Sequence, residues 1–478
     1  MFDVAIIGAG VVGAMVAREL AKYQLKIILL EKKNDVAMGA SRANSGIVHA
    51  GYDCAPGSLK ARLNVEGAAM MEEVCKTLGV KFKRNGSLVI GFDEEDRKGI
   101  EKLMEKGKAN GVEVQFLDQT GVRALEPNIG GNVTCALYAP TGGIVCPYDL
   151  TIAALGNAMD NGAELQRNFP VSAIEKIDGG YRISSENGEV KARFVVNCAG
   201  LYSDEIAKMV GDDSISVHPR KGEYILLDKE CGGLVSNTIF RTPSKMGKGI
   251  LVSPTVDGNL LLGPTSVDKE DKEDKDTTEG GFAEILSKAK EYVENLHAGK
   301  AITSFCGLRA VGNTGDFVIT SRSPGFVNAA GIESPGLSAS PAIAKYIAEM
   351  LKEQGLELVE NPAHIATRVS SHHFRDASLE EKNAMIRENP AYGRIICRCE
   401  GVTEGEILDA IRRNPGATDL DGVKRRTRAQ MGRCQGGFCM PYVTELLAKE
   451  LGIAYEDVTK CGGESLINVE KTKGGMAQ

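Results

Sequence analysis

The pattern of apolar and polar residues in the N-terminal segment predicts a strand, then a helix, then a second strand. The short apolar run at residues 3–7 predicts a buried parallel strand, and residues 11–23 predict the helix that follows it. Residues 26–30 predict a second strand, which ends at Glu31. Together they form a βαβ unit of about the length that nucleotide binding requires.

Two later apolar runs predict further strands of the same sheet. Residues 194–197 and 326–329 are each followed by small residues, and residues 341–351 predict a helix after the second run. Between them, residues 81–90 and 220–265 hold short β-like runs separated by Gly, Pro, Asn and Asp, a pattern typical of an antiparallel sheet. The chain is therefore predicted to be α/β, with a Rossmann-like nucleotide-binding domain interleaved with a β-rich domain.

Three polar segments are expected outside these cores. Residues 268–279 mix charges of both signs and predict a solvated loop. Residues 424–428 predict a solvated helix face in preference to a docking patch for an acidic partner. Residues 353–390 carry few apolar repeats and predict a linker that wraps back over the body.

Composition narrows the class of protein. The chain has 478 residues, 42% hydrophobic and 25% charged, which suits a soluble protein of roughly two to four domains. A net charge of −7 offers no basic footprint for nucleic acid. The longest apolar run, residues 4–17, is shorter than the ~20 residues that span a bilayer and follows no basic leader. We therefore expect a cytoplasmic protein without a membrane span, whose twelve cysteines are thiols or metal ligands rather than disulfides.

A glycine-rich turn at residues 8–13 joins the first strand to its helix. Gly8 allows a tight turn, Gly10 leaves no side chain between the backbone and a pyrophosphate, and Gly13 lets helix and strand pack closely. The helix N-terminus offers N–H groups to the phosphates, and Glu31 suits two ribose hydroxyls while disfavouring a 2′-phosphate. A tight helix–sheet contact without a ligand would use the same glycines. Since no later segment repeats the motif, we expect no second dinucleotide site for NADH in this chain.

Four sequence blocks resemble the D-amino-acid-oxidase-like superfamily of FAD proteins. Residues 41–51 are similar to its flavin-contact loop, and residues 55–62 are similar to its glycerol-3-phosphate and L-2-hydroxyglutarate dehydrogenase branches. Residues 197–204 and 331–338 agree with the superfamily, and the resemblance covers residues 1–355. It implies that the nucleotide is FAD, and that a helix N-terminus near the flavin stabilises its anionic reduced form. The implied FAD-binding residues are Gly8, Gly10, Gly13, Glu31, Ser41, Asn44, Ser45, Gly46, Gly200, Gly331, Gly336, Leu337 and Ser338.

Oxidation of a secondary alcohol by a flavin needs a base for the hydroxyl proton and cations for the substrate's anionic end. His49 lies in the block similar to the flavin-contact loop and suits the base, although a histidine that only orders the loop has equal standing. Arg309 lies where the superfamily often keeps a substrate-binding arginine, and its planar fork suits a carboxylate or a phosphate. A surface salt bridge is the alternative for Arg309. Other candidate anion-binding residues, in falling order, are Arg220, Lys221, Lys245 and Lys248.

Four cysteines gather near the C-terminus: Cys397, Cys399, Cys434 and Cys439. Residues two apart in an extended segment point the same way, so the first two can reach one metal centre. The module resembles the bacterioferritin-associated-ferredoxin-type [2Fe-2S] domain, and residues 422–428 and 431–434 resemble the version fused to anaerobic glycerol-3-phosphate dehydrogenases. Structural zinc is the alternative, but zinc sites favour two-residue gaps between cysteines.

The two resemblances imply a division into five parts. An FAD-binding domain comprises residues 1–80, 145–210 and 325–355, and a β-rich substrate domain comprises residues 81–144 and 211–324. A linker at residues 356–392 is followed by the [2Fe-2S] domain at residues 393–456 and a tail at residues 457–478.

A hydride delivers two electrons to FAD, whereas a [2Fe-2S] cluster carries one at a time. The resemblance thus implies a dehydrogenase that oxidises glycerol 3-phosphate to dihydroxyacetone phosphate and passes electrons through the cluster to a partner redox protein, such as an NAD-linked flavoprotein or a membrane-associated subunit. Two alternatives remain. One is an L-2-hydroxyglutarate (2-hydroxy acid) dehydrogenase of the same fold, and the other is a non-catalytic electron-transfer subunit with the same cofactors.

Overall fold

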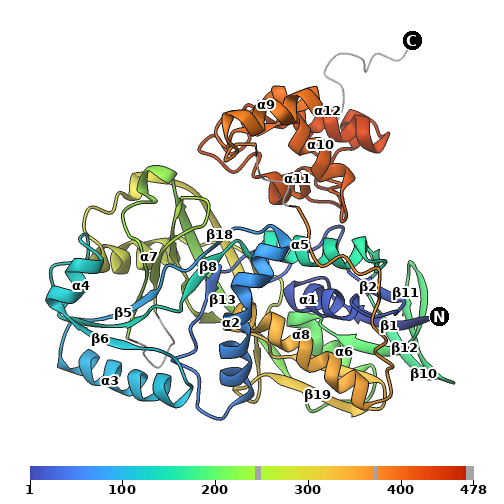
Figure 1. Ribbon diagram of the computed structural model, residues 1–478, viewed down its shortest axis with the longest axis horizontal. Coiled ribbons are helices and arrows are strands. Elements are labelled where there is room, and N and C mark those ends of the chain that lie inside the picture. Colours follow the sequence, from blue (N-terminus) through green and yellow to red (C-terminus); the bar gives the residue numbers. More distant parts are fainter. Residues whose placement is uncertain (243–248, 370–373, 470–478) are drawn as a thin grey trace.

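The N-terminal strand lies inside a mixed sheet, flanked on both sides by parallel neighbours (Figure 1). The computed structural model describes residues 1–242, 249–369 and 374–469. β1 (Phe2–Ile7) pairs in parallel with β2 (Ile27–Leu30) and with β12 (Gly188–Asn197). The other strands of the sheet are β9 (Glu164–Gln166) and β20 (Phe326–Ala330), both parallel, and the antiparallel β10 (Ala173–Ile177), β11 (Gly180–Ser185) and β19 (Val318–Ser323).

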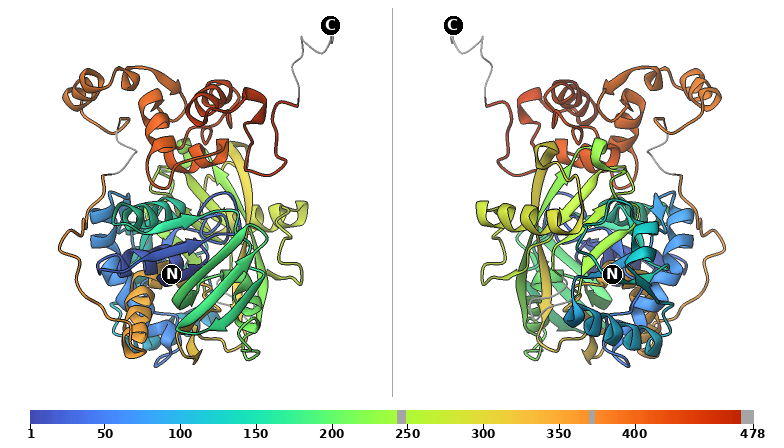
Figure 2. Two further views of the ribbon diagram at one scale, coloured as in Figure 1. Left: turned by 90° about the vertical axis from the view of Figure 1, so that its right-hand side faces the viewer. Right: turned by 90° about the vertical axis from the view of Figure 1, so that its left-hand side faces the viewer.

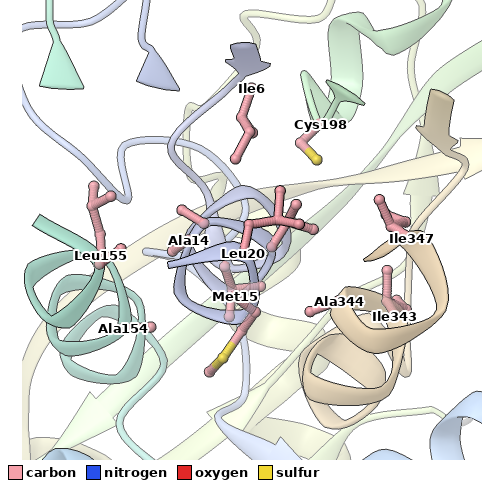
Figure 3. Packing of buried hydrophobic residues seen from close by; sticks show 14 of the residues in the cluster. Ile6, Ala14, Met15, Leu20, Ala154, Leu155, Cys198, Ile343, Ala344 and Ile347 are labelled. Carbon is pink, nitrogen blue, oxygen red and sulfur yellow. The ribbon is translucent and has the colours of Figure 1, made fainter. Parts of the chain in front are cut away.

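Helices cover one face of this sheet and form the largest apolar core with it. Figure 3 shows α1 (Val11–Leu20) between α5 (Pro147–Asp160) and α8 (Gly336–Glu353), with Ile6 of β1 above them. α2 (Leu59–Leu78) packs along α8 and closes the same core. The sheet and its first helix confirm the predicted nucleotide-binding unit, although α1 ends at Leu20, three residues before the predicted end.

α8 begins five residues before the start that the sequence predicts, because Pro341 lies inside the helix and not at its beginning. A proline cannot donate to the carbonyl four residues earlier, which here is that of Leu337. The Ser340 hydroxyl donates to this carbonyl oxygen instead, at 2.9 Å. The neighbouring serine thus replaces the lost backbone hydrogen bond and allows the helix to start at Gly336.

A second, largely antiparallel sheet forms the β-rich part. Its long strands β13 (Val217–Leu227) and β18 (Ala301–Gly312) pair along almost their whole length. One pair, β14 with β5, is parallel. The remaining strands are β5 (Ser87–Gly91), β6 (Gln115–Asp118), β7 (Cys135–Ala139), β14 (Thr238–Arg241), β15 (Leu251–Pro254), β16 (Leu260–Gly263) and β17 (Val267–Asp268). α3 (Glu94–Ala109), α4 (Gln119–Leu125) and α7 (Glu279–Tyr292) flank this sheet.

A small three-stranded sheet ties the segment after β2 to the rest of the fold. β3 (Ile47–Val48) and β4 (Phe82–Lys83) both pair with β8 (Gly143–Val145). These pairings hold the predicted flavin-contact loop between the two larger sheets.

The C-terminal part is a separate helical unit that sits on one end of the body (Figure 2). It has its own apolar core. Thr403 and Glu406 form the capping box that opens its second helix, as the sequence pattern predicts. Its elements are α9 (Leu379–Glu388), β21 (Ile395–Cys397), β22 (Val402–Thr403), α10 (Glu404–Arg412), α11 (Leu420–Thr427) and α12 (Met440–Leu451).

The predicted linker has two structural parts. Residues 356–369 run back along the body, where the Val359 carbonyl accepts from Gln24 N–H and the Arg368 N–H donates to Thr77. α9 interrupts the segment that was predicted to be irregular, because Ser378 and Glu381 form a capping box. None of its residues is buried, so no apolar period marks it in the sequence.

Buried ion pairs hold the C-terminal unit on the body and overturn the expectation of a solvated helix face at residues 424–428. Asp35 of the body is fully buried and accepts from Arg425 (2.5 Å) and Arg426 (2.7 and 2.8 Å) of α11. Arg428 donates to Asp257 of the body at 2.8 Å and to Glu400 of its own unit at 3.0 Å. The basic cluster therefore does dock against acidic groups, and these belong to the same chain.

Candidate active site and metal centre

A cavity of about 660 Å³ runs between the parallel sheet and the β-rich sheet. Its wall begins at the glycine-rich turn before α1 and at the end of β2. It continues along the loop of residues 38–49 to strands β13 and β18 and to the segment before α8. A cavity of this size that is lined by the N-termini of two helices, α1 and α8, suits a dinucleotide.

The glycine-rich turn is packed so closely that side chains are excluded. Gly8 has φ +104°, and a Cβ there would lie 2.5 Å from the Cys198 carbonyl oxygen. A Cβ at Gly13 would lie 2.0 Å from the carbonyl oxygen of Gly8. Gly10 caps α1 without a side-chain hydrogen bond and lines the cavity. The turn thus brings backbone, and no side chain, up to the place where a pyrophosphate would lie.

Glu31 ends β2 and lines the same end of the cavity. Its carboxylate accepts from the N–H groups of Ala9 (2.8 Å) and Lys33 (2.9 Å). Burial raises the pKa of Glu31, while the N–H groups of Lys33 and Ala9 act in the opposite direction. A fixed carboxylate at the end of this strand is what the prediction of a ribose acceptor requires.

The charged loop expected at residues 268–279 is tied across this end of the cavity by ion pairs. Lys272 and Glu273 line the cavity, and Tyr202 donates to Glu273. Lys272 reaches Asp204 and Glu205, each at 2.8 Å. The segment is therefore a loop, as predicted, but one whose charges close the nucleotide end.

His49 lies at the other end, on the strap that follows β3. Its backbone N–H donates to the Ser338 hydroxyl at 2.8 Å, and its Nε2 is 3.3 Å from the Ser334 hydroxyl. The ring also contacts Phe240, with centroids 5.9 Å apart. These contacts orient a half-buried imidazole whose ring lines the cavity.

Arg309 lies on β18 and lines the same cavity. Its Nη2 donates to the Thr265 carbonyl oxygen at 2.8 Å, while its buried Nε has no partner among the described residues. The Tyr224 hydroxyl, 3.4 Å from that of Ser45, belongs to the adjoining strand β13. The anchored nitrogen holds the guanidinium in place, and the donors that face the cavity are placed to receive an anion.

Not every residue predicted for the site lines the cavity. The predicted residues along its wall are Gly8, Gly10, Glu31, Ser41, Asn44, Ser45, His49, Gly200, Arg309, Gly336 and Leu337. Gly13, Gly46, Gly331 and Ser338 lie behind the wall. A Cβ at Gly46 would lie 2.5 Å from the Val145 carbonyl oxygen, so this glycine supports the flavin-contact loop.

The second-choice anion residues are already paired with carboxylates. Arg220 lines the cavity but binds Asp268 at 2.5 Å, and Lys221 is buried against Asp274 at 2.7 Å. Lys245 and Lys248 lie outside the described residues. Sequence reasoning missed the aromatic wall of Tyr224 and Phe240, which only the pairing of distant strands brings to the cavity.

The four C-terminal cysteines meet in two pairs. The Sγ atoms of Cys399 and Cys434 are 3.6 Å apart, and the Cys439 thiol hydrogen-bonds to Cys397. Across the described residues, no three Cys, His, Asp or Glu side chains converge as ligands of one ion. Two thiol pairs suit a cluster of two irons, with two thiolates on each iron.

In each cysteine pair the pKa of one thiol is lowered, whereas that of its partner, Cys439 or Cys399, is raised by the same hydrogen bond together with burial. The bond from Cys439 lowers the pKa of Cys397, assisted by the N–H groups of Gln430 and Glu400. Burial alone would raise the pKa of Cys434, but the N–H groups of Gly436, Gly437 and Phe438, together with Cys399, lower it. The glycines between the last two cysteines thus let backbone donors surround a sulfur.

Comparison with known proteins defines the class to which this fold and site belong. Residues 3–350 match the family described as FAD dependent oxidoreductase, and residues 395–449 match the BFD-like [2Fe-2S] binding domain. The chain belongs to the FAD dependent oxidoreductase family and carries a [2Fe-2S] domain at its C-terminus. FAD and a [2Fe-2S] cluster are its cofactors, which the close-packed glycine turn and the paired thiols fit.

Individual relatives share the architecture to different extents. The chain is 48% identical over 476 residues to a glycerol 3-phosphate dehydrogenase of Caloramator mitchellensis, which covers 99% of both chains. The FAD-bound structure of L-alpha-glycerophosphate oxidase from Mycoplasma pneumoniae, 30% identical, aligns with a TM-score of 0.73 over 77% of this chain and 98% of that one. Human mitochondrial L-2-hydroxyglutarate dehydrogenase is 34% identical over 284 residues, which is 56% of this chain and 61% of that protein. No helix among the described residues is long and apolar enough to cross a membrane.

Proposed function

We propose that this FAD-dependent oxidoreductase oxidises glycerol 3-phosphate to dihydroxyacetone phosphate and passes the electrons through its [2Fe-2S] cluster to a partner redox protein in the cytoplasm. The relative that is 48% identical over the full length of both chains, cluster domain included, is a glycerol 3-phosphate dehydrogenase. The observation that carries the proposal is Arg309, whose guanidinium is anchored on the Thr265 carbonyl oxygen and lines a cavity that His49 also lines.

Arg309 binds the anionic end of the substrate and fixes its orientation. Its Nη2 is anchored on the Thr265 carbonyl oxygen, and the guanidinium can still give a phosphate two hydrogen bonds, from Nη1 and from the second N–H of Nη2. Phe240, whose ring contacts that of His49, and Leu251 also line the cavity and give it apolar walls. The Tyr224 hydroxyl adds a neutral donor, because burial raises the pKa of this phenol.

His49 takes the proton of the substrate hydroxyl. Its backbone is fixed by Ser338 and its Nε2 by Ser334, so the imidazole points into the cavity in a defined orientation. Bound FAD supplies the acceptor for the hydride from the carbon that carries this hydroxyl. The substrate loses a hydride and a proton, and His49 carries only the proton.

Anaerobic stopped-flow spectroscopy tests the proposal. Glycerol 3-phosphate should bleach the flavin absorbance, and Arg309→Met should lower kcat/KM about 100-fold or more, since two charge-assisted hydrogen bonds are lost. Arg322→Met is the matched control, because Arg322 is exposed and its nearest acid, Asp212, is 3.9 Å away. Absence of bleaching by glycerol 3-phosphate would refute the proposal. Bleaching by L-2-hydroxyglutarate alone would assign the rival substrate.

A further inference from the structure

The cysteine pairs differ in their access to solvent. Cys397 and Cys439 are each 1% exposed, whereas Cys399 is exposed and Cys434 is half-buried. One edge of the cluster site therefore lies beneath the domain's own core, and the other edge meets solvent. An electron can leave the protein over the shortest distance at the Cys399–Cys434 edge.

Two large side chains that follow Cys434 closely in the sequence are exposed. Phe438 is 80% exposed, although it stands between the ligands Cys434 and Cys439. Tyr442, one helical turn further on, is 49% exposed. Single exposed apolar residues are ordinary, but an aromatic pair beside a redox centre marks a contact surface.

Three arginines flank this edge in a chain whose net charge is −7, and since two of them pair with carboxylates, Arg398 carries the positive charge that is left. Arg398 stands between Cys397 and Cys399, is exposed and makes no ion pair among the described residues. Arg394 lies over the Tyr442 ring, 5.8 Å from its centroid, is 59% exposed and pairs with Glu404 at 2.8 Å. Arg433, next to Cys434, is 63% exposed beside Asp228 and Glu230. We call Arg394, Arg398, Cys399, Cys434, Phe438 and Tyr442 the exit face.

Other parts of the domain already contact the body. Glu400 is buried and binds Lys229 of the body at 2.8 Å, while Arg425 and Arg426 bind Asp35. These buried pairs fix the domain in one orientation on the body. A partner must therefore come to the exit face, because the domain is held in place.

We propose that the exit face docks a one-electron redox protein whose surface is acidic around its own redox centre. This inference rests on the proposed exit of electrons through the cluster. In each encounter the reduced cluster loses one electron and the partner's centre gains it, with no bond made or broken. Two encounters return the two electrons of one substrate. Arg398 steers the acidic rim of the partner, and Phe438 packs at the centre of the contact.

The test uses the holoenzyme and two haem proteins of opposite surface charge, acidic cytochrome b5 and basic cytochrome c. The enzyme is reduced anaerobically with dithionite, the excess reductant is removed, and haem reduction is followed by stopped flow at increasing NaCl. Because dithionite replaces the substrate, the result does not depend on whether glycerol 3-phosphate is oxidised. Electron paramagnetic resonance of the reduced cluster normalises each variant to its intact cluster content.

We expect the rate of cytochrome b5 reduction to be highest at low salt and to fall as the salt concentration rises. Arg398→Glu should slow this reaction about tenfold or more and leave cytochrome c unchanged or faster. Phe438→Ala should slow cytochrome b5 reduction at every salt concentration. The matched controls Arg322→Glu and Phe116→Ala change exposed residues on the body and should have no effect.

Two results would overturn the proposal. Wild-type rates with cytochrome b5 in both Arg398→Glu and Phe438→Ala would show that the acceptor docks elsewhere. Equal slowing of both haem proteins by Arg398→Glu would show a changed cluster and not a lost docking charge.

Discussion

Replacing Asp35 by asparagine tests how the cluster domain is held on the body. The Asp35 carboxylate is fully buried and accepts three hydrogen bonds from Arg425 and Arg426, at 2.5 to 2.8 Å, with Arg167 at 4.0 Å. Asparagine keeps the volume but removes the charge and turns one acceptor into a donor. Removal of one partner from a buried ion pair costs about 3–5 kcal/mol, because the remaining charges are left uncompensated.

The assay is urea unfolding of the holoprotein, followed by the visible absorbance of the cluster. Asp35→Asn should lower the stability of the cluster domain by about 3–5 kcal/mol and speed proteolysis between residues 356 and 392. Glu450→Gln is the control in the same domain. Its partner Arg412 is 57% exposed, and a surface pair contributes less than about 1 kcal/mol.

The pH dependence of the cluster domain's stability follows from the same contacts. Burial would raise the pKa of Asp35, but Arg426, Arg425 and Arg167 hold it well below the usual range. A carboxyl whose pKa is lowered on folding stabilises the fold fully above its unfolded pKa of about 4, and this contribution is lost as the pH falls below it. Asp35→Asn should lack this acid-side loss. The reasoning would be refuted if Asp35→Asn changed the free energy of unfolding by less than about 0.5 kcal/mol and left the loss of stability at acidic pH as in the wild type.

Three further changes probe the FAD site. Glu31→Gln should weaken FAD binding about 10- to 100-fold, since it replaces a charged acceptor for the ribose. The fluorescence of FAD released after dilution measures the affinity. Unchanged affinity would contradict the assigned role. Gly8→Ala should prevent FAD retention because its Cβ would meet Cys198, whereas Gly280→Ala, which meets nothing within 4 Å, should keep the wild-type FAD content and Tm. Lys272→Ala should speed FAD release at low salt, because two ion pairs at 2.8 Å close the nucleotide end of the cavity. At high salt the variant and the wild type should release FAD at the same rate. Equal rates at low salt as well would show that the loop does not close the cavity.

Local signals sufficed for the nucleotide unit and the cysteine loops. The first strand, Glu31 and the paired cysteines are each specified by neighbours in sequence, through apolar runs, glycine spacing and residue type. The fold class follows from these features, whereas FAD and the [2Fe-2S] cluster were predicted from the resemblance to known families, which the family matches confirm. His49 and Arg309 were also placed in one cavity, although their chemical roles remain predictions.

The remaining features depend on contacts between distant segments. The composition of a helix that contains Lys424, Arg425 and Arg426 predicts exposure to solvent. Burial of the two arginines becomes favourable through Asp35, which lies 390 positions before Arg425. Tyr224 and Phe240 reach the cavity through strand pairing, which no local pattern encodes. Pro341 marked a false helix start because the hydroxyl of Ser340, which replaces the lost hydrogen bond, has no signature of its own.

Asp35 lies in the stretch that runs from Glu31 to the flavin-contact loop, so one segment serves both cofactor sites. Its ends face the FAD cavity, and its middle is clamped by the iron–sulfur domain. If FAD binding orders this segment, it also favours the ion pairs of Asp35 with the cluster domain. Docking of the cluster domain then favours FAD binding by the same free energy, because linkage is reciprocal. Assembly in the cell would then proceed toward the doubly loaded protein, and chains that carry a single cofactor would be the ones most open to proteolysis.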